Sequence, residues 1–240
     1  MINTIHLWDC LEIMKSIPDG SIDAIITDPP YWTTACKWDS VIPFEPMWKE
    51  LKRIIKPNWA IVLFGSEPFS SALRMGNIKQ YKYDIIWEKP NPSNPLLAKK
   101  RFMSFHENIS IFYKKQPTYN PQKVERLDKD KRKAVNKHYS KPDILGGKVF
   151  IEAIDTISDL KHPSSVLKFN RQQGVHPTQK PVELIEYLIK TYTQEWETVL
   201  DFTAWSGTTW VACQNTNRNY ILIEKDETYF NIIKQRLWLQ

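Results

Sequence analysis

Short apolar runs alternate along this chain with segments of helical periodicity, and this alternation limits its fold more than any other feature. The run Ile22–Thr27 is largely apolar, as expected for a strand that is buried on both faces of a parallel sheet. Strands that alternate with helices indicate an open α/β sheet with helices on both faces. Because ligands bind such sheets beyond the carboxyl ends of the strands, functional residues are expected directly after the strands.

Runs of β-branched and aromatic residues bounded by turn residues predict seven strands, at residues 3–7, 22–27, 60–64, 83–87, 109–113, 198–202 and 220–223. Helical periodicity predicts helices between them, at residues 11–17, 45–55, 68–75, 181–191, 208–215 and 227–237. Pro181 is expected at the first position of its helix, where a missing N–H costs nothing.

The stretch from 114 to 174 interrupts this pattern. It contains four prolines and a Lys/Arg-rich run, and it predicts no long element, which is unusual for a connection inside a compact domain. We therefore expect one α/β domain formed by residues 1–113 and 175–240, with residues 114–174 inserted as a small lobe.

Charge is distributed unevenly along the sequence. The chain has a net charge of +6, but residues 90–180 contain 18 Lys/Arg against 8 Asp/Glu. The rest of the chain is slightly acidic, so a basic lobe that binds a polyanion is one interpretation. A solvated, positively charged loop surface is the other, and charge alone does not separate the two.

The sequence also predicts the compartment. No apolar run is long enough to span a bilayer, and the first residues lack the pattern of a signal peptide. The three cysteines, Cys10, Cys36 and Cys213, are widely spaced and odd in number. They predict a reducing cytoplasm with no disulfide framework and no metal site.

The most informative motif is Asp28-Pro29-Pro30-Tyr31, directly after the strand at 22–27. Two prolines fix the backbone and remove two N–H donors, which leaves a rigid turn with carboxylate and carbonyl acceptors and an aromatic face. Such a turn suits an exocyclic amine on a flat ring, because it accepts the amine hydrogens while Tyr31 stacks on the ring. The alternative is an ordinary strand-ending turn in which the prolines block a helix.

Together with other motifs, this tetrapeptide resembles the amino-methyltransferases that act on adenine N6 or cytosine N4 of DNA, in the motif order of their beta class. The motifs extend over nearly the whole chain. They are Leu7, Asp9 and Leu11; Asp28-Pro29-Pro30-Tyr31; His106-Glu107; His176-Pro177-Thr178-Gln179-Lys180-Pro181; Val199-Leu200-Asp201-Phe202; Ser206-Gly207-Thr208-Thr209; and Ile223-Glu224-Lys225-Asp226.

The resemblance implies a class I methyltransferase fold, a Rossmann-like seven-stranded sheet. Residues 1–113 would form the catalytic half, 114–174 a basic target-recognition lobe, and 175–240 the half that binds S-adenosylmethionine. Asp28, Pro29, Pro30 and Tyr31 would be catalytic. The cofactor would be held by Asp9 at its adenine amine, by Glu224 at its ribose hydroxyls, and by Thr178, Lys180, Asp201, Phe202, Trp205, Ser206, Gly207, Thr208, Thr209 and Lys225. The loop before residue 208 would present N–H groups and a helix dipole to the cofactor carboxylate.

The implied reaction is direct methyl transfer to adenine N6 in double-stranded DNA, with the target nucleotide flipped out of the duplex. The Asp-headed tetrapeptide favours adenine, and cytosine N4 is the alternative. RNA or a protein amide would also present a flat amine to this turn, although the size of the basic region favours DNA. A homodimer and a partner restriction endonuclease are further expectations from the resemblance.

Several tryptophans stand where the family has glycine. Trp205 lies in the presumed cofactor loop, Trp210 follows that loop, and Trp32 follows Tyr31; Trp8, Trp59 and Trp196 are further examples. Glycine permits positive φ and close approach of a ligand, and tryptophan does neither. One hypothesis is therefore a methyltransferase scaffold with impaired cofactor binding, or a DNA-binding module that has lost catalysis. The alternative is a bent loop whose indole points outward.

Overall fold

The computed structural model describes residues 2–31, 40–126, 140–142, 148–150, 159–171 and 179–238. The chain divides into two compact units, one of Met1–Asn120 with Ser164–Gln240 and one of Pro121–Pro163. In its described part, the smaller unit contains two antiparallel pairs of short strands, β6 (Val124–Glu125) with β9 (Leu160–Lys161) and β7 (Ser140–Pro142) with β8 (Lys148–Phe150). The target-recognition role of the insertion stays a prediction.

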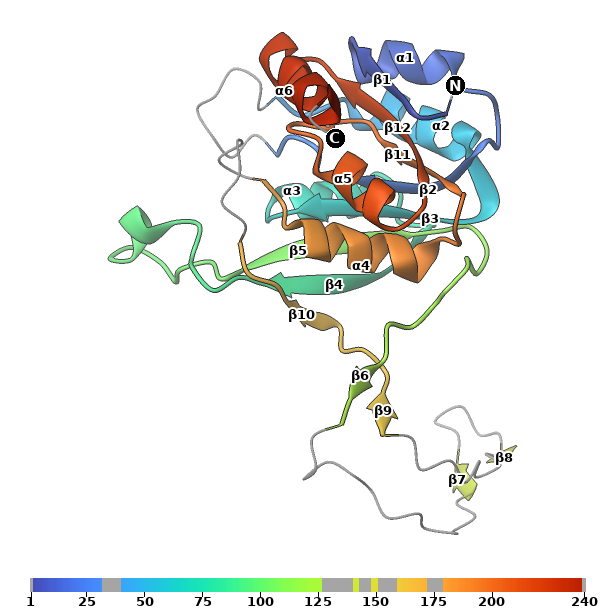
Figure 1. Ribbon diagram of the computed structural model, residues 1–240. Helices are drawn as coiled ribbons and strands as arrows, with labels where there is room; N and C mark the ends of the chain where they lie inside the picture. Colours follow the sequence, from blue (N-terminus) through green and yellow to red (C-terminus); the bar gives the residue numbers. More distant parts are fainter. Residues whose placement is uncertain are drawn as a thin grey trace. The chain divides into compact units, whose positions relative to one another are not determined.

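The larger unit contains one eight-stranded sheet, shown in Figure 1. Its order is β1 (Thr4–Leu7), β12 (Asn219–Glu224), β11 (Thr198–Asp201), β2 (Ile22–Thr27), β3 (Ile55–Gly65), β5 (His106–Phe112), β4 (Tyr81–Glu88) and β10 (Val166–Lys168). All pairs are parallel except the two that β5 makes with β3 and β4. The predicted α/β class and the seven predicted strands are confirmed. The additional strand, β10, has only three residues, too few to produce a periodicity.

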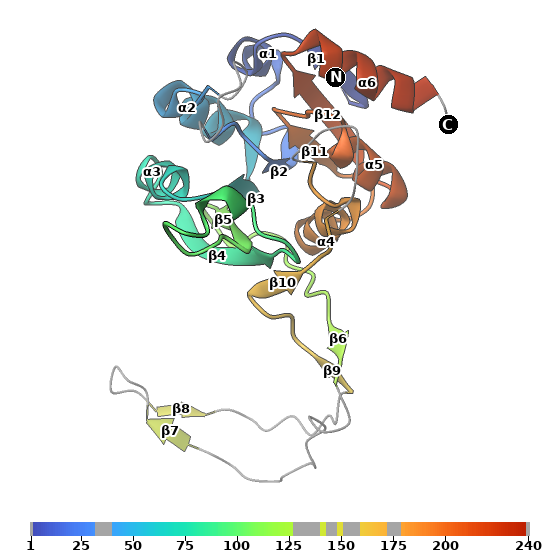
Figure 2. The same cartoon turned by 90° about the vertical axis from the view of Figure 1, so that its left-hand side faces the viewer.

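Helices cover both faces of this sheet (Figure 2). Helices α1 (Cys10–Ser16), α2 (Phe44–Ile54) and α3 (Phe69–Met75) lie on one face. Helices α4 (Val182–Tyr192), α5 (Thr208–Asn215) and α6 (Glu227–Trp238) lie on the other. The prediction for Pro181 is wrong by one residue, since its extended ψ of 134° makes it the N-cap and the helix begins at Val182. No helix in the described part of the chain is long and apolar enough to cross a membrane.

Two hydrophobic cores follow from the alternation of side chains along the central strands. Ile25 and Leu63 belong to the core under α1, α2 and α3, whereas Ala24 and Val62 belong to the core under α4, α5 and α6. Every residue of β2 is buried. Each fully buried aliphatic side chain of this kind contributes about 1.5–3 kcal/mol, so these cores fix the edge of the sheet where the strands end.

That edge collects residues that are far apart in sequence. The parallel strands β2, β11 and β12 all end there. Asp28 directly follows β2, and Asp201 and Glu224 are the last residues of β11 and β12. Because β5 runs antiparallel, its beginning rather than its end lies at this edge, and Asn108 pairs with Gly65 at the end of β3. Glu107 is therefore brought to the same edge.

A test of this packing is Gly207→Ala, before α5. Gly207 has a φ of +81°, and an added Cβ would lie 3.1 Å from Cγ2 of Ile233 on α6. The left-handed conformation costs about 1–2 kcal/mol for a residue with a Cβ, and overpacking adds to this cost. The matched control is Gly20→Ala, since Gly20 has a φ of +57° but nothing within 4 Å of an added Cβ. We expect G207A to lower the free energy of unfolding in urea by more than G20A; equal losses would contradict the packing of α6 against this loop.

Candidate active site

The Asp28 turn is held by four donors. Tyr31 Oη donates to Oδ1 of Asp28, and Lys180 Nζ donates to Oδ2. The backbone carbonyl of Asp28 accepts from Thr203 Oγ1 at 3.0 Å and from the indole Nε1 of Trp205 at 2.8 Å. Pro29 and Pro30 are buried behind the turn. The carboxylate therefore has a fixed orientation at the end of β2.

Lys180 is the centre of a buried ion cluster that extends beyond Asp28. Its Nζ lies 3.2 Å from Oε2 of Glu107, and Lys89 Nζ lies 2.8 Å from Oε1 of the same glutamate. The side chains of Lys180 and Lys89 are only 7% and 1% exposed. Two carboxylates and two ammonium groups thus balance each other, and buried ions are tolerated only when paired in this way.

Burial and pairing act on the pKa of each member. Burial raises the pKa of Asp28, although Lys180 acts against that shift. Burial would raise the pKa of Glu107 too, but Lys180 and Lys89 hold it at about 2. Burial also opposes the charge on Lys180, and Asp28 with Glu107 more than offsets it, so the pKa of Lys180 is raised. The cluster keeps Lys180 charged beside an Asp28 whose proton affinity is increased.

Aromatic rings surround the same lysine. Lys180 Nζ lies 5.2 Å from the centre of the Phe64 ring and 5.7 Å from that of Tyr31. The Tyr31 ring packs on Phe69 with centroids 5.1 Å apart and is half-buried. A flat, electron-rich surface therefore lies next to the Asp28 carboxylate.

Two cavities meet at this edge, and Trp205 lines both. The smaller, of about 20 Å³, holds little more than a water molecule; among the predicted residues it is lined by Asp28, Lys180, Asp201, Ser206, Thr208 and Thr209. The larger, of about 430 Å³, is in the range of small-molecule sites. Among the predicted residues it is lined by Asp9, Pro30, Phe202, Glu224 and Lys225.

Glu224 supplies the main acceptor in the larger cavity. Its carboxylate accepts the backbone N–H groups of Trp205 at 2.7 Å and Asp226 at 2.8 Å. Burial raises its pKa to about 7 despite these bonds. Asp9 caps α1 through the Leu11 N–H at 2.9 Å, and its other oxygen lies 3.5 Å from Lys225 Nζ.

Trp205 has a φ of +49°, a backbone region that glycine adopts without cost. Its indole points inward, toward the Asp28 carbonyl, and its ring lies edge-on to Tyr229 with centroids 6.1 Å apart. The outward indole considered from the sequence is therefore not the arrangement found. The ring forms part of the wall between the two cavities.

Asp201, the last residue of β11, accepts hydrogen bonds from the surrounding elements. It accepts from Thr27 Oγ1 at 3.0 Å, the Thr203 N–H at 3.1 Å and Thr209 Oγ1 at 2.5 Å, and burial raises its pKa to about 6. These bonds tie β2, the loop and α5 together. Ser206 donates to Gln179 at 3.0 Å, and Gly207 is the N-cap of α5. Thr178, with Trp32 and His176, lies outside the described residues.

Two site residues were not among those predicted from the sequence. Glu107 stood in a recognised motif, but its position beside Lys180 depends on the antiparallel direction of β5. Lys89 directly follows β4, and a lone lysine at a strand end gives no signal in sequence. Lys180, which was predicted to bind the cofactor, pairs with Asp28. Its role in cofactor binding stays a prediction.

Comparison with known proteins agrees with this geometry. The profile of the N6_N4_Mtase family, described as DNA methylase, matches residues 22–235. The chain is 29% identical over 267 residues to the type II methyltransferase M.HinfI of Haemophilus influenzae, covering 98% of this chain and 68% of that protein. It is 27% identical over 262 residues to the type II methyltransferase M2.MboI of Moraxella bovis, covering 97% and 86%.

Solved structures give the same result. The complex of M1.HpyAVI with SAM superposes with a TM-score of 0.63 at 27% identity, covering 97% of this chain and 98% of that one. The cytosine-N4-specific PvuII DNA methyltransferase superposes with a TM-score of 0.70 at 17% identity, covering 98% and 86%, which is a likeness of fold.

The ion cluster predicts the effect of Lys180→Met. The variant leaves Asp28 and Glu107 without the cation between them, and breaking such a buried pair costs about 3–5 kcal/mol of unfolding free energy at pH 7. The loss should shrink toward pH 5, because Asp28, whose pKa burial already raises, then takes up a proton.

The control is Lys190→Met on α4. Lys190 is 45% exposed and lies 3.6 Å from Glu186, so its loss should cost less than about 1 kcal/mol. Urea unfolding at both pH values measures the difference. A small, pH-independent loss for K180M, equal to that for K190M, would show that Asp28 and Glu107 do not depend on Lys180.

Proposed function

The chain belongs to the N6_N4_Mtase family of DNA methylases, and we propose that it transfers a methyl group from S-adenosylmethionine to adenine N6 in double-stranded DNA. The observation that carries this proposal is the Asp28 carboxylate, fixed by Lys180 and Tyr31 at the edge of the sheet beside a cavity of ligand size. Cytosine N4 is the alternative target, and the Asp-headed turn favours adenine.

The larger cavity fits the proposed cofactor. Glu224 is a buried acceptor that would accept from the ribose hydroxyls, and Asp9, which lines the same cavity, would accept from the adenine amine. Phe202 offers an aromatic surface to a sulfonium. S-adenosylmethionine supplies an electrophilic methyl group; when the C–S bond breaks, both bonding electrons stay on the sulfur atom.

The chain contributes orientation and charge to the reaction. Asp28 accepts one N–H of the target amine, which directs the nitrogen lone pair toward the methyl group. Lys180 favours the ionised form of that carboxyl group and so acts against the rise in its pKa that burial causes. As the new N–C bond forms, the amine loses one proton, which Asp28 passes to solvent. Tyr31, beside that carboxylate, would stack on the base.

We infer that Trp205 weakens cofactor binding without abolishing it. The indole and Thr203 together occupy both lone pairs of the Asp28 carbonyl, and the indole ring forms part of the cavity wall. The cavity of about 430 Å³ nevertheless remains with the indole in place. A module that binds DNA without catalysis is the competing interpretation of the same residue.

Access to the amine requires the nucleotide to leave the duplex. The basic residues of the 90–180 region suit the phosphates, and the 114–174 insertion is the candidate for reading the sequence. A cytoplasmic location, proposed from the cysteine pattern, is a further proposal. A homodimer and a partner endonuclease are proposed from the family resemblance.

Expression in a host without DNA methylation tests the reaction. Sequencing of host DNA for modified bases, with mass spectrometry of its nucleosides, should reveal N6-methyladenine in one sequence context. Asp28→Asn should reduce transfer by at least a hundredfold, since the amine loses its charged acceptor. Asp19→Asn, at a side chain that is 78% exposed, is the control and should leave transfer unchanged. N4-methylcytosine would establish the alternative target, and unmodified DNA with intact DNA binding would establish the non-catalytic module.

The raised pKa of Glu224 predicts a pH dependence of cofactor binding. Its carboxyl group is protonated below a pH of about 7 and becomes an anion, able to accept two hydroxyl donors, above that pH. The affinity for S-adenosylmethionine, measured by calorimetry between pH 6 and 8.5, should therefore rise with pH through about 7. Glu224→Gln should bind weakly and lose this component. The same pH profile in E224Q would mean that Glu224 does not contact the cofactor.

A further inference from the structure

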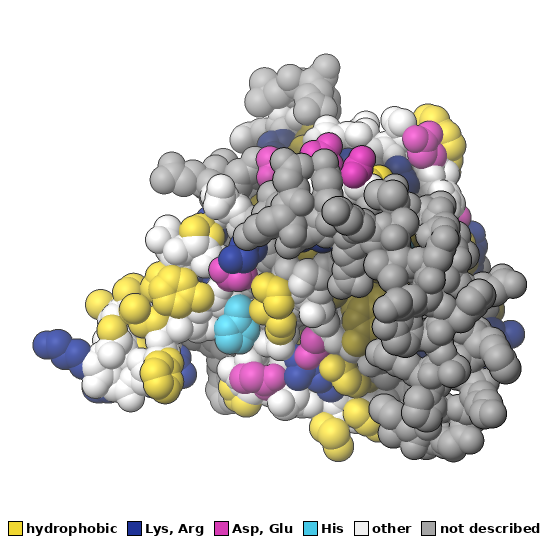
Figure 3. All heavy atoms as spheres, turned by 90° about the horizontal axis from the view of Figure 1, so that it is seen from below, with side chains coloured by type: hydrophobic (Ala, Val, Ile, Leu, Met, Phe, Trp, Pro, Cys, Tyr) yellow, Lys and Arg dark blue, Asp and Glu magenta, His cyan; other side chains and the backbone are white. Residues whose placement is uncertain are grey.

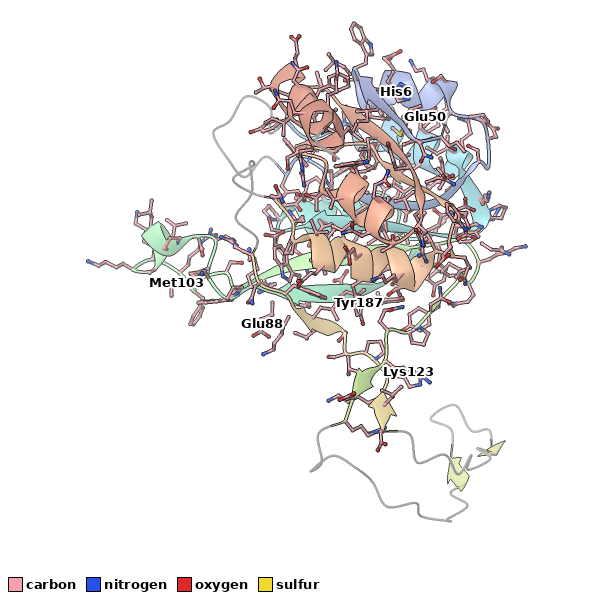
Figure 4. The ribbon with its side chains drawn as sticks, in the orientation of Figure 1. His6, Glu50, Glu88, Met103, Lys123 and Tyr187 are labelled. Carbon is pink, nitrogen blue, oxygen red and sulfur yellow. The ribbon has the colours of Figure 1, made fainter. Side chains whose placement is uncertain are left out.

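Residues 89–105, which connect β4 to β5, form an arm that projects from the sheet (Figure 1). Figure 4 shows Met103 on this arm, away from the helices, with Glu88 near its root. The arm contains Lys89, Lys99, Lys100 and Arg101 and no aspartate or glutamate. In Figure 3, apolar and basic side chains gather on the projection at the left of the view.

The outer part of the arm exposes large apolar side chains. Phe102 is 99% exposed and Leu96 is 96% exposed; Met103 and Phe105 are 41% and 40% exposed. Single exposed apolar residues are normal on protein surfaces, but an exposed apolar group enclosed by polar residues marks an interaction site. Within the described part of the chain, no carboxylate pairs with Lys99, Lys100 or Arg101, so their charges are available to a partner.

Backbone hydrogen bonds give the arm a defined shape. Lys89 N–H donates to the Phe105 carbonyl at 2.7 Å, and Ser93 N–H donates to the Ser104 carbonyl at 3.0 Å. The Ser104 N–H also donates to Oδ1 of Asn94 at 2.7 Å. A short 3-10 helix, Pro95–Leu97, begins the outer turn. The two sides of the arm are thus joined from the root to Asn94 and Ser104, and Leu96 and Phe102 lie beyond these bonds.

The root of the arm is part of the ion cluster. Lys89 donates to Ser93 Oγ within the arm and to Glu107, which pairs with Lys180 beside Asp28. Three ion pairs, Lys89–Glu107, Glu107–Lys180 and Lys180–Asp28, thus connect the root of the arm to the carboxylate that is proposed to receive the target amine.

We propose that this arm enters duplex DNA beside the target base, with Phe102 and Leu96 filling the space left by the flipped nucleotide. Lys99, Lys100 and Arg101 then bind the flanking phosphates. Apolar wedges that separate base steps, supported by cations on the backbone, are a known physical means of opening a duplex. The inference rests on the proposed function, because it requires DNA as the substrate.

The same features disfavour a second copy of the chain as the occupant. Two arms of like charge repel each other, and a tip of this size buries far less than the roughly 800 Å² per partner of a stable interface. A polyanion satisfies both the charge and the exposed rings.

Phe102→Ala and Leu96→Ala test the wedge. Phe102→Ala should weaken binding to a duplex, measured by fluorescence anisotropy without cofactor, by about tenfold, the scale of one base–aromatic stacking contact. Leu96→Ala should weaken it by less, because a leucine side chain cannot stack on a base as a ring does. On a duplex with 2-aminopurine at the target position, the fluorescence increase on binding should also fall. Met75→Ala, which removes a side chain that is 70% exposed at the end of α3, is the control and should bind as wild type.

Lys99→Gln with Lys100→Gln tests the phosphate contacts on any duplex. The negative slope of log affinity against log salt should become shallower by about 2, because two counterion-releasing contacts are lost. Lys49→Gln with Lys79→Gln, an equal charge change at two exposed lysines, should leave the slope unchanged.

The results separate this inference from the proposed function. If wild type binds no DNA, the proposed function fails together with the arm. If wild type binds DNA and F102A, L96A and K99Q/K100Q match it in affinity and salt slope, only the arm proposal is overturned. A wild-type dimer that F102A converts to a monomer, in sedimentation velocity, would overturn it in favour of a contact between copies.

Discussion

The placement of Lys180 between Asp28 and Glu107 is the interaction on which the rest of the site depends. It balances the charge of two buried carboxylates, and it joins the loop before α4 to the end of β2 and the beginning of β5. Lys89 extends the same pairing to the root of the arm. One charge-balanced cluster thus fixes the Asp28 carboxylate, the proposed acceptor for the amine, and connects it to the surface proposed to open the duplex.

Much of the fold could be predicted from sequence because its periodicities are simple. The buried strand Ile22–Thr27 and the turn that follows it are adjacent in sequence, so the position of Asp28 at the edge of the sheet followed from local pattern alone. Glu107 and Lys89 were missed as a pair because their meeting depends on the antiparallel direction of β5, which no local pattern specifies. Lys180 illustrates the same limit: its motif was recognised, but its partner Asp28 is 152 residues away.

Trp205 was identified from sequence as a departure from glycine, and the structure supplies the geometry. Its positive φ shows that the loop keeps a backbone shape suited to glycine, and the inward indole then takes the Asp28 carbonyl as its acceptor. Trp205 lines both cavities, and we propose that a side chain of this size acts on both the cofactor and the carboxylate. On this proposal, cofactor affinity and catalysis are coupled through a single residue.

The central claim is that the cavity containing Glu224 is the cofactor site and that Trp205 limits its use. Equilibrium dialysis of labelled S-adenosylmethionine with wild type and with Trp205→Gly tests it most directly. The account predicts weak, saturable binding to wild type and binding at least tenfold tighter to W205G, because the substitution removes the indole from the cavity lining. Equal affinities, or tighter binding by wild type, would contradict it.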